Sequence, residues 1–288
     1  MKTLRTIAEL RSVLDGERAL GRTVGLVPTM GYLHDGHLSL MRQARAQTDL
    51  VVASIFVNPL QFGAGEDLDA YPRDVARDGR LADASGVDLL FVPSTDEMYP
   101  TPVLTTVSVA QVSEPLEGGA RPNHFAGVAT VVAKLFAIVG PCRAYFGEKD
   151  FQQLAVVRRM ARDLSFPVEV VGCPTVRELD GLALSSRNSY LSPEARDAAP
   201  VVYRALRAGA ATVLAGERDA PAVRALMAQI IEAEPLAQLD YAEVVDADSF
   251  RIPDPLTGNL RLLAAVRFGR ARLIDNVGVT VPAPTQGG

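Results

Sequence analysis

The sequence predicts an α/β fold, in which a parallel sheet is covered by helices on both faces and followed by a smaller α+β domain. Three observations support this prediction. Strand and helix signals alternate through the first two-thirds of the chain. Residues 50–57 form an unbroken apolar run, which is typical of a strand buried on both faces. From about Val176 the alternation stops, so we expect one domain over residues 1–175 and a second over residues 176–288.

The first domain is predicted to open with a short buried strand over residues 23–27 and a helix that begins near His37. Apolar residues recur at helical spacing after that histidine, at Leu38, Leu40, Met41 and Ala44. After the strand at 50–57 comes a loop at 58–69. The later signals predict a helix at 73–84, a strand at 87–92, a core helix at 128–139, a strand at 143–147, a helix at 151–164 and a strand at 168–171.

The second domain is predicted to begin with a polar joint at residues 176–188. Helical signals then cover residues 193–215 and 220–233, and strand signals follow at 241–245, 260–266 and 271–274. The tail at 281–288 is rich in Pro and Gly, so we expect it to be frayed.

Charge and hydropathy exclude several classes of function. The net charge of −5 leaves no excess of Lys and Arg to neutralise a nucleic-acid backbone. The first six residues lack the apolar core of a signal peptide. The apolar run at 128–139 is too short to span a bilayer and contains Lys134. We therefore expect a cytoplasmic protein without nucleic-acid or membrane partners, in which Cys142 and Cys173 are buried free thiols.

Two of the chain's three histidines, His34 and His37, lie where the first strand turns into a helix. Gly31 and Gly36 allow the backbone to turn tightly and to approach a ligand. The helix N-terminus directs unpaired N–H groups and partial positive charge at the turn. In a parallel sheet, ligands bind beyond the carboxyl ends of the strands, where this turn falls. The pattern predicts an anion site, most simply for a phosphate.

Three interpretations of the histidine pair remain open at this stage. The rings could supply two ligands to zinc, although no Cys or third His stands nearby. His37 could cap the helix while His34 is merely exposed. Both rings could instead stabilise the triphosphate of a nucleotide as its α-phosphorus is attacked, and the strand–glycine–helix context favours this interpretation. The usual dinucleotide-binding and P-loop motifs are absent from the sequence.

Other polar segments could complete such a site. Lys149, one of only three lysines, lies at a second strand-to-helix junction and could bind a phosphate, or belong to a solvated turn. Two hydroxyls and a guanidinium at the domain joint could fold over a triphosphate, although Ser-rich loops are common. Gln61 and Gln153 are suited to orienting a small hydroxy acid, or are surface residues. His124 precedes the core helix and could cap it.

Taken together, these segments closely resemble the pantoate–β-alanine ligase (pantothenate synthetase) family over nearly the whole chain. Any single motif is unspecific, whereas their ordered combination is highly specific. The motifs are Pro28-Thr29-Met30-Gly31 with His34-Asp35-Gly36-His37, Phe56-Val57-Asn58-Pro59 with Gln61-Phe62, Asp69-Ala70-Tyr71-Pro72-Arg73, His124-Phe125-Ala126-Gly127-Val128, Phe146-Gly147-Glu148-Lys149-Asp150 with Gln152-Gln153, Ser185-Ser186-Arg187-Asn188 and Ile274-Asp275-Asn276.

The resemblance implies an ATP-dependent ligase that condenses pantoate with β-alanine to give pantothenate, AMP and pyrophosphate. Pantoate first attacks the α-phosphorus to form pantoyl adenylate, and the amine of β-alanine then displaces AMP. The resemblance also implies a Rossmann-like nucleotidyltransferase domain, a smaller domain that closes over the ATP site, a requirement for Mg²⁺ through unknown ligands, and a homodimer.

The resemblance assigns roles to particular residues. Gln61 and Gln153 would bind pantoate, and Gln61 would also bind β-alanine. His34, His37, Lys149, Ser185 and Arg187 would be catalytic, with His37 as the proton donor. The ATP site would be lined by Met30, Gly31, Tyr32, Leu33, His34, Asp35, Gly36, His37, Gly147, Glu148, Lys149, Asp150, Val176, Leu184, Ser185, Ser186 and Arg187.

Two positions depart from the family pattern. Leu184 stands where the family usually has Met, which is a tolerated apolar exchange. Asn123 replaces a common Gly before His124 and is expected to alter that loop locally. Two rival functions share the histidine turn: a nucleotidyltransferase with a stable nucleotide product, such as a cytidylyltransferase, and a nucleotide sensor that performs no catalysis.

Overall fold

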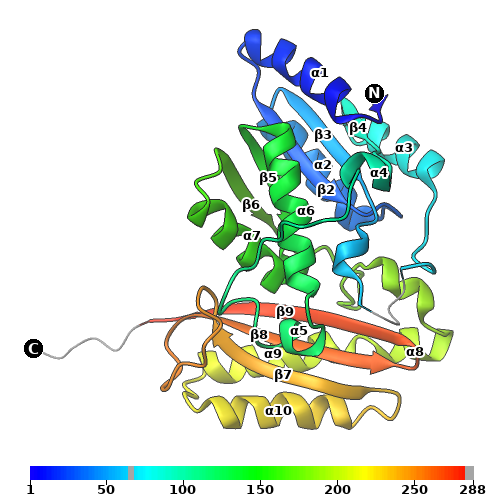
Figure 1. The fold of residues 1–288 in the computed structure, drawn as a ribbon. Coiled ribbons are helices and arrows are strands. Elements are labelled where there is room, and N and C mark those ends of the chain that lie inside the picture. Colours follow the sequence, from blue (N-terminus) through cyan, green and yellow to red (C-terminus); the bar gives the residue numbers. More distant parts are fainter. Residues whose placement is uncertain (64–67, 283–288) are drawn as a thin grey trace, which may run out of the picture. The chain divides into compact units, whose positions relative to one another are not determined.

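The computed structural model describes residues 1–63 and 68–282. The chain divides into two compact units (Figure 1). Unit 1 comprises Met1–Glu148 and Gln152–Pro174, and unit 2 comprises Lys149–Phe151 and Thr175–Gly288. Part of the loop predicted at 58–69, and all but two residues of the tail predicted at 281–288, lie outside the described residues.

Unit 1 contains a six-stranded sheet in which every pair of neighbouring strands is parallel, as the alternating pattern predicts. The order β1-β4-β3-β2-β5-β6 reverses direction between β2 and β5. Ligands of open parallel sheets bind at such a reversal, beyond the carboxyl ends of the strands. The strands are β1 (Lys2–Leu4), β2 (Val24–Thr29), β3 (Leu50–Ile55), β4 (Leu89–Phe91), β5 (Cys142–Gly147) and β6 (Val168–Cys173).

Helices cover the sheet of unit 1. Met41 and Ala44 of α2 and Ala82 of α3 share one buried cluster with Val51 and Ala53 of β3. In Figure 1 the apolar helix α6 crosses in front of the sheet. The helical segments are α1 (Ile7–Ala19), α2 (Asp35–Gln47), α3 (Val75–Ala84), α4 (Thr95–Met98), α5 (Glu117–Ala120), α6 (His124–Val139), α7 (Phe151–Asp163) and the 3-10 turns η1 (Pro59–Gln61) and η2 (Glu148–Asp150).

Several boundaries differ from the sequence predictions for physical reasons. No element was predicted before residue 23, yet β1 and α1 form there, and α1 begins with a capping box between Thr6 and Glu9. Helix α2 begins at Asp35 rather than near His37, because His34 is its N-cap. Helix α3 begins at Val75 rather than residue 73, because the Asp74 side chain accepts from the backbone N–H of Arg77.

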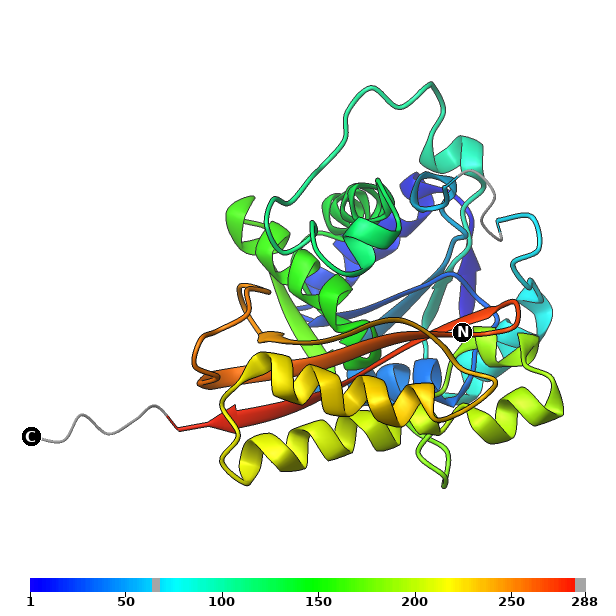
Figure 2. The ribbon, with the colours of Figure 1, turned by 90° about the horizontal axis from the view of Figure 1, so that it is seen from below.

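Unit 2 is built on a three-stranded antiparallel sheet with its own apolar core. Figure 2 shows two of its helices, α9 and α10, side by side along the sheet. The single helix predicted at 193–215 is wrong, since a break occurs at Pro200, which has no N–H to donate within a helix. The elements are η3 (Ser186–Tyr190), α8 (Pro193–Ala198), α9 (Val201–Leu214), α10 (Ala220–Glu232), β7 (Gln238–Asp246), β8 (Gly258–Phe268) and β9 (Ala271–Val281).

Both cysteines are free thiols, and their environments differ. Cys173 is buried as predicted, whereas Cys142 is only half-buried. Burial raises the pKa of Cys142 to about 12 and that of Cys173 to about 11, so both remain protonated and poorly nucleophilic at neutral pH. Among the described residues, no helix has the length and apolar character needed to cross a bilayer.

Candidate active site

The predicted anion site lies at the point where the strand order reverses. The turn that carries His34 and His37 follows β2. In the neighbouring strand β5, Gly147 is the last residue and Glu148 comes directly after it. The carboxyl ends of two adjacent parallel strands therefore bring these two segments, which are far apart in sequence, to the same edge of the sheet.

The backbone reverses sharply between β2 and α2. Gly31 has φ +87° and Tyr32 has φ +50°, so two successive residues adopt the left-handed region. The Gly31 N–H donates to Thr29 Oγ1 (3.2 Å), and that hydroxyl donates to the Ser54 carbonyl of β3 (2.7 Å). Gly31 thus supplies the predicted conformational freedom, whereas Gly36 lies in the first turn of α2.

Both imidazoles cap helix α2, so the interpretation in which only His37 caps it is wrong. The Gly36 N–H donates to Nδ1 of His34 (3.2 Å), and the His34 N–H donates to Nδ1 of His37 (3.4 Å). The two ring centroids lie 4.1 Å apart. The two rings thus accept hydrogen bonds from two backbone N–H groups at the start of the helix, those of His34 and Gly36. Other side chains form the same reciprocal arrangement in a capping box.

The capping bonds also determine which ring nitrogens carry hydrogen. Because each Nδ1 accepts a hydrogen bond, the proton of each neutral ring is assigned to Nε2. Two N–H donors are thereby joined to the positive end of a helix, which suits an anion. For the zinc interpretation, no group of three His, Cys, Asp or Glu suited to a metal occurs within residues 1–63 and 68–282.

Asp78 of α3 is a site residue that sequence reasoning missed. Its side chain is buried, with 1% exposed, and its two oxygens accept from the N–H groups of Tyr32 (2.6 Å) and Leu33 (2.8 Å). These bonds hold the turn immediately before His34. In the sequence, Asp78 looks like an ordinary polar residue in the first turns of a helix.

Gln61 contacts the histidine turn. Its Nε2 lies 3.0 Å from Sδ of Met30, and its Oε1 accepts from Nδ2 of Asn58 (3.2 Å). Only 8% of Gln61 is exposed, so it is not the surface residue of the alternative interpretation. Asn58 is also buried and donates to the carbonyl of Gly127, which ties this loop to α6.

His124 anchors the loop of Gln61. Its Nδ1 lies 2.9 Å from the Gln61 carbonyl, and its Nε2 lies 3.1 Å from Nη1 of Arg121. These partners assign the ring proton to Nδ1, the opposite of His34 and His37. Asn123 precedes it with φ +67°, a conformation that Gly adopts freely and Asn tolerates better than most residues. Asn is therefore one of the few residues other than Gly that this backbone position accommodates readily, and the expected local change of the loop stays a prediction.

The two glutamines at the start of α7 behave differently. Gln152 is 3% exposed; its Oε1 accepts from the Glu117 N–H, and its Nε2 donates to the carbonyls of Val112 and Pro115. Gln152 therefore holds the loop before α6 in place. Gln153, the predicted pantoate ligand, is half-buried on the same helix.

Lys149 belongs to unit 2. Its carbonyl accepts from Nδ2 of Asn276 (2.8 Å), and the following Phe151 ring lies under the guanidinium of Arg261 (3.6 Å to the centroid). The Lys149 ammonium lies 3.4 Å from the Asp150 carboxylate. Its side chain is 18% exposed and that of Asp150 is 47% exposed, so Lys149 is the more buried side chain of the pair in a partly solvated turn.

A hairpin in unit 2 brings Val176 and Leu184 together. The Leu184 N–H donates to the Val176 carbonyl (3.0 Å), and Arg177 pairs with Ala183 in an antiparallel bridge. Arg177 also forms two hydrogen bonds to the buried carboxylate of Asp275 (2.6 and 2.8 Å). The motif near Asp275 therefore serves to hold this hairpin on β9.

The hairpin leads directly into the hydroxyl-rich segment. Ser185 caps the 3-10 helix η3, and its side chain accepts from the Arg187 N–H (3.3 Å). The Asn188 side chain donates to the Ala183 carbonyl (3.1 Å). Ser186 and Arg187 thus lie in the 3-10 turn η3, Ser185 is its N-cap, and all three residues are half-buried.

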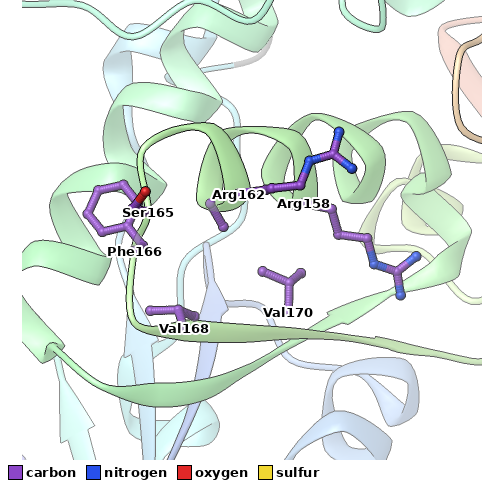
Figure 3. Close-up of a pocket in the computed structure, with 7 residues that line it drawn as sticks. Arg158, Arg162, Ser165, Phe166, Val168 and Val170 are labelled. Atoms are coloured by element: carbon purple, nitrogen blue, oxygen red, sulfur yellow. The ribbon is translucent and has the colours of Figure 1, made fainter.

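A cavity of about 380 Å³ lies elsewhere in unit 1, between α7 and β6. Figure 3 shows Arg158 and Arg162 on the helix and Val168 and Val170 on the strand. The lining residues of β6 include Val168, at the amino-terminal end of that strand, and none of the predicted site residues lines the cavity. The cavity is therefore separate from the candidate active site.

Comparison with known proteins gives a family match over nearly the whole chain. The family model for Pantoate-beta-alanine ligase matches residues 2–278. A pantothenate synthetase of Roseiflexus sp. (strain RS-1) is 56% identical over 276 residues, covering 96% of this chain and 98% of that protein.

Solved structures agree with this match. The pantothenate synthetase from Thermus thermophilus has a TM-score of 0.91 and 53% identity, covering 96% of this chain and 99% of its own. The pantoate-beta-alanine ligase from Francisella tularensis, complexed with beta-gamma ATP and beta-alanine, has a TM-score of 0.79 and 32% identity, covering 96% and 97%.

Gly127→Ala tests how α6 supports Gln61. A methyl group at residue 127 would overlap the Leu60 carbonyl and lie 2.6 Å from the Gln61 backbone nitrogen. We expect a loss of about 1–3 kcal/mol of stability from overpacking, together with displacement of Gln61. Thermal unfolding measures the first effect and a crystal structure of the variant the second.

Gly16→Ala is the matched control. Gly16 lies in α1, and a methyl group there has no neighbour within 4 Å. We expect this variant to be more stable by about 0.5–1 kcal/mol. A Gly127→Ala protein as stable as the Gly16→Ala protein, with Gln61 in place, would contradict the packing argument.

Proposed function

The chain belongs to the pantoate–β-alanine ligase family, and we propose that it joins pantoate to β-alanine in two steps that use ATP and pass through pantoyl adenylate. Family membership makes it a ligase and favours this reaction over a nucleotidyltransferase with a stable nucleotide product or a nucleotide sensor. One structural observation carries the residue-level proposal: at the β2–β5 reversal, two imidazoles accept the N–H groups that begin α2 through Nδ1, which assigns the ring N–H of each to Nε2.

In the first step, a pantoate carboxylate oxygen attacks the α-phosphorus of ATP. The bond from that phosphorus to the bridging oxygen breaks, and pyrophosphate leaves with the bonding electrons. His34 and His37 donate hydrogen bonds from Nε2 to the phosphate oxygens whose charge increases, and His37, the proton donor implied by the family resemblance, acts through the Nε2–H that its neutral ring keeps. The N-terminus of α2 adds its partial positive charge. Met30–His37, Gly147 and Glu148 line the nucleotide.

In the second step, the amine of β-alanine attacks the carbonyl carbon of the adenylate. The carbon–oxygen bond to AMP breaks, AMP leaves, and the new amide nitrogen loses a proton. We assign Gln61 and Gln153 to pantoate, and Gln61 also to β-alanine. The contact of Gln61 with Met30 supports this assignment, because it places an amide next to the nucleotide-binding turn. Alignment of the reactants can lower the barrier by about 7–11 kcal/mol.

Residues of unit 2 supply further groups for ATP in this proposal. Lys149 and Arg187 add positive charge to the phosphates, Ser185 and Ser186 add hydroxyls, and Asp150 a carboxylate. Val176 and Leu184 provide apolar contacts, and their pairing across the hairpin supports a shared role. We also propose that unit 2 closes during the reaction, since an acyl adenylate must be protected from water.

Magnesium fits this site as an ion carried by the nucleotide. Mg²⁺ typically binds one or two protein carboxylates, with substrate phosphates and water completing its shell. The described residues contain no group of three acidic, His or Cys ligands, and the proposed ATP segments carry three carboxylates, those of Asp35, Glu148 and Asp150. One of these carboxylates would hold the ion, which supplies neutralisation of phosphate charge. We further propose, from the family resemblance, that the chain acts as a homodimer in the cytoplasm.

The reaction itself is tested by product analysis with the purified chain. We expect pyrophosphate release to require both ATP and pantoate, and AMP and amide to form once β-alanine is added. Phosphate detection after addition of a pyrophosphatase measures the released pyrophosphate, and mass spectrometry identifies AMP and the amide. Pyrophosphate release that does not depend on pantoate, or a nucleotide joined stably to a product, would contradict the proposed function.

The role of His37 is tested by His37→Ala. This change removes one donor to the reacting phosphate, which typically lowers the rate by about 10²–10³-fold. Pantoate-dependent exchange of pyrophosphate into ATP measures the first step. Thermal unfolding controls for the loss of the capping bond to the His34 N–H. An exchange rate equal to that of the unchanged protein would show that the ring serves the helix alone.

A further inference from the structure

The carboxylate of Asp78 occupies the place that a bound anion would take in the turn. Its two oxygens accept from two successive backbone N–H groups, those of Tyr32 and Leu33. The side chain is buried, and both bonds are short, as expected when the acceptor is charged. Successive N–H groups that converge in this way form an anion-binding concavity in many proteins.

The turn needs such a partner because its backbone is strained. Tyr32 has a left-handed φ of +50°, which costs roughly 1–2 kcal/mol for a residue with a side chain. A buried N–H without an acceptor would add a further penalty. The guanidinium of Arg77 lies 3.4 Å from the same carboxylate and 5.3 Å from the Tyr32 ring centroid, so it helps to compensate the charge.

The carboxylate also controls the position of the histidine pair. Leu33 is fully buried, and the next residue is His34, the N-cap of α2. The bond from the Leu33 N–H to Asp78 therefore also fixes the backbone of His34. The His34 ring is attached to that backbone, and the His37 ring accepts a hydrogen bond from its N–H, so both rings depend on it. Because Asp78 already occupies these two N–H groups, the phosphates of a nucleotide are directed to the rings and to the N-terminus of α2.

We propose that Asp78 is a positioning residue for adenylation: its carboxylate fills the backbone concavity at Tyr32 and Leu33 as an internal anion and so holds His34 and His37 for the triphosphate. This inference rests on the proposed function. It differs from a purely structural role, because it predicts that the adenylation step, which uses the triphosphate, depends on Asp78 far more than the attack of the amine.

The test compares both half-reactions in Asp78→Asn. The amide keeps the size of the side chain, but its NH₂ group faces an N–H donor, so one bond is lost. We expect pantoate-dependent ATP–pyrophosphate exchange to fall by about 100-fold, as for a small misplacement of reacting groups. Attack of β-alanine on supplied pantoyl adenylate should change less than about threefold, since that step does not use the triphosphate.

Asp74→Ala is the matched control on the same helix. It removes the N-cap of α3 at a typical cost of about 1 kcal/mol and leaves both Asp78 bonds in place. We expect both half-reactions to be unchanged in it. The proposal is wrong if Asp74→Ala loses ATP–pyrophosphate exchange to the same extent as Asp78→Asn. It is also wrong if Asp78→Asn slows both half-reactions equally, or slows neither.

A measurement independent of catalysis separates this proposal from the proposed function. In ¹⁵N spectra of the histidine rings, Asp78→Asn should shift the signals of His34 and His37 and leave those of His124 in place. Unmoved His34 and His37 signals overturn the proposal even if the unchanged protein proves to have no ligase activity. If Asp78→Asn does not fold, Asp78→Glu, which keeps the charge but displaces the oxygens, serves for the same comparisons.

Discussion

The capping of helix α2 by two imidazoles is the constraint on which the candidate active site depends. The backbone N–H groups of His34 and Gly36 donate to the Nδ1 atoms of the rings. The same bonds that start the helix therefore set the hydrogen on Nε2 and orient the rings. Structure and chemistry share these side chains, because a ring that satisfies the helix end with one nitrogen presents a donor with the other.

Neighbouring parts of unit 1 converge on this turn. Strand β2 ends there, next to β5, at the reversal of the strand order. Asp78 holds the backbone just before His34, and Gln61 reaches Met30 just before the reversal of the chain. The Gln61 loop is fixed in turn by His124 and by the close approach of Gly127. His124 thus supports Gln61, the proposed pantoate ligand. Its ring carries the hydrogen on Nδ1, whereas the rings of His34 and His37 carry it on Nε2.

The sequence was sufficient for features that depend on local pattern. Strand and helix alternation predicted the parallel sheet, and the apolar periodicity after His37 predicted a helix that begins at the histidine turn. Features that depend on tertiary contacts were missed. Asp78 is 45 residues from Leu33, and nothing near it in sequence indicates which N–H groups it will meet. Similarly, only the fold shows that Gln152, rather than its neighbour Gln153, holds the 112–117 loop. The three-residue strand β1 is too short to show a period.

The most direct test of this account is a ¹⁵N NMR spectrum of the neutral histidine rings, of which the chain has only three. The hydrogen bonds predict that His34 and His37 carry their proton on Nε2 and that His124 carries it on Nδ1. They also predict that a non-hydrolysable ATP analogue shifts the Nε2 signals of the first two rings most strongly. Protons on Nδ1 of His34 and His37, or Nε2 signals that do not respond to the analogue, would contradict the claim that helix capping orients the two donors toward the nucleotide.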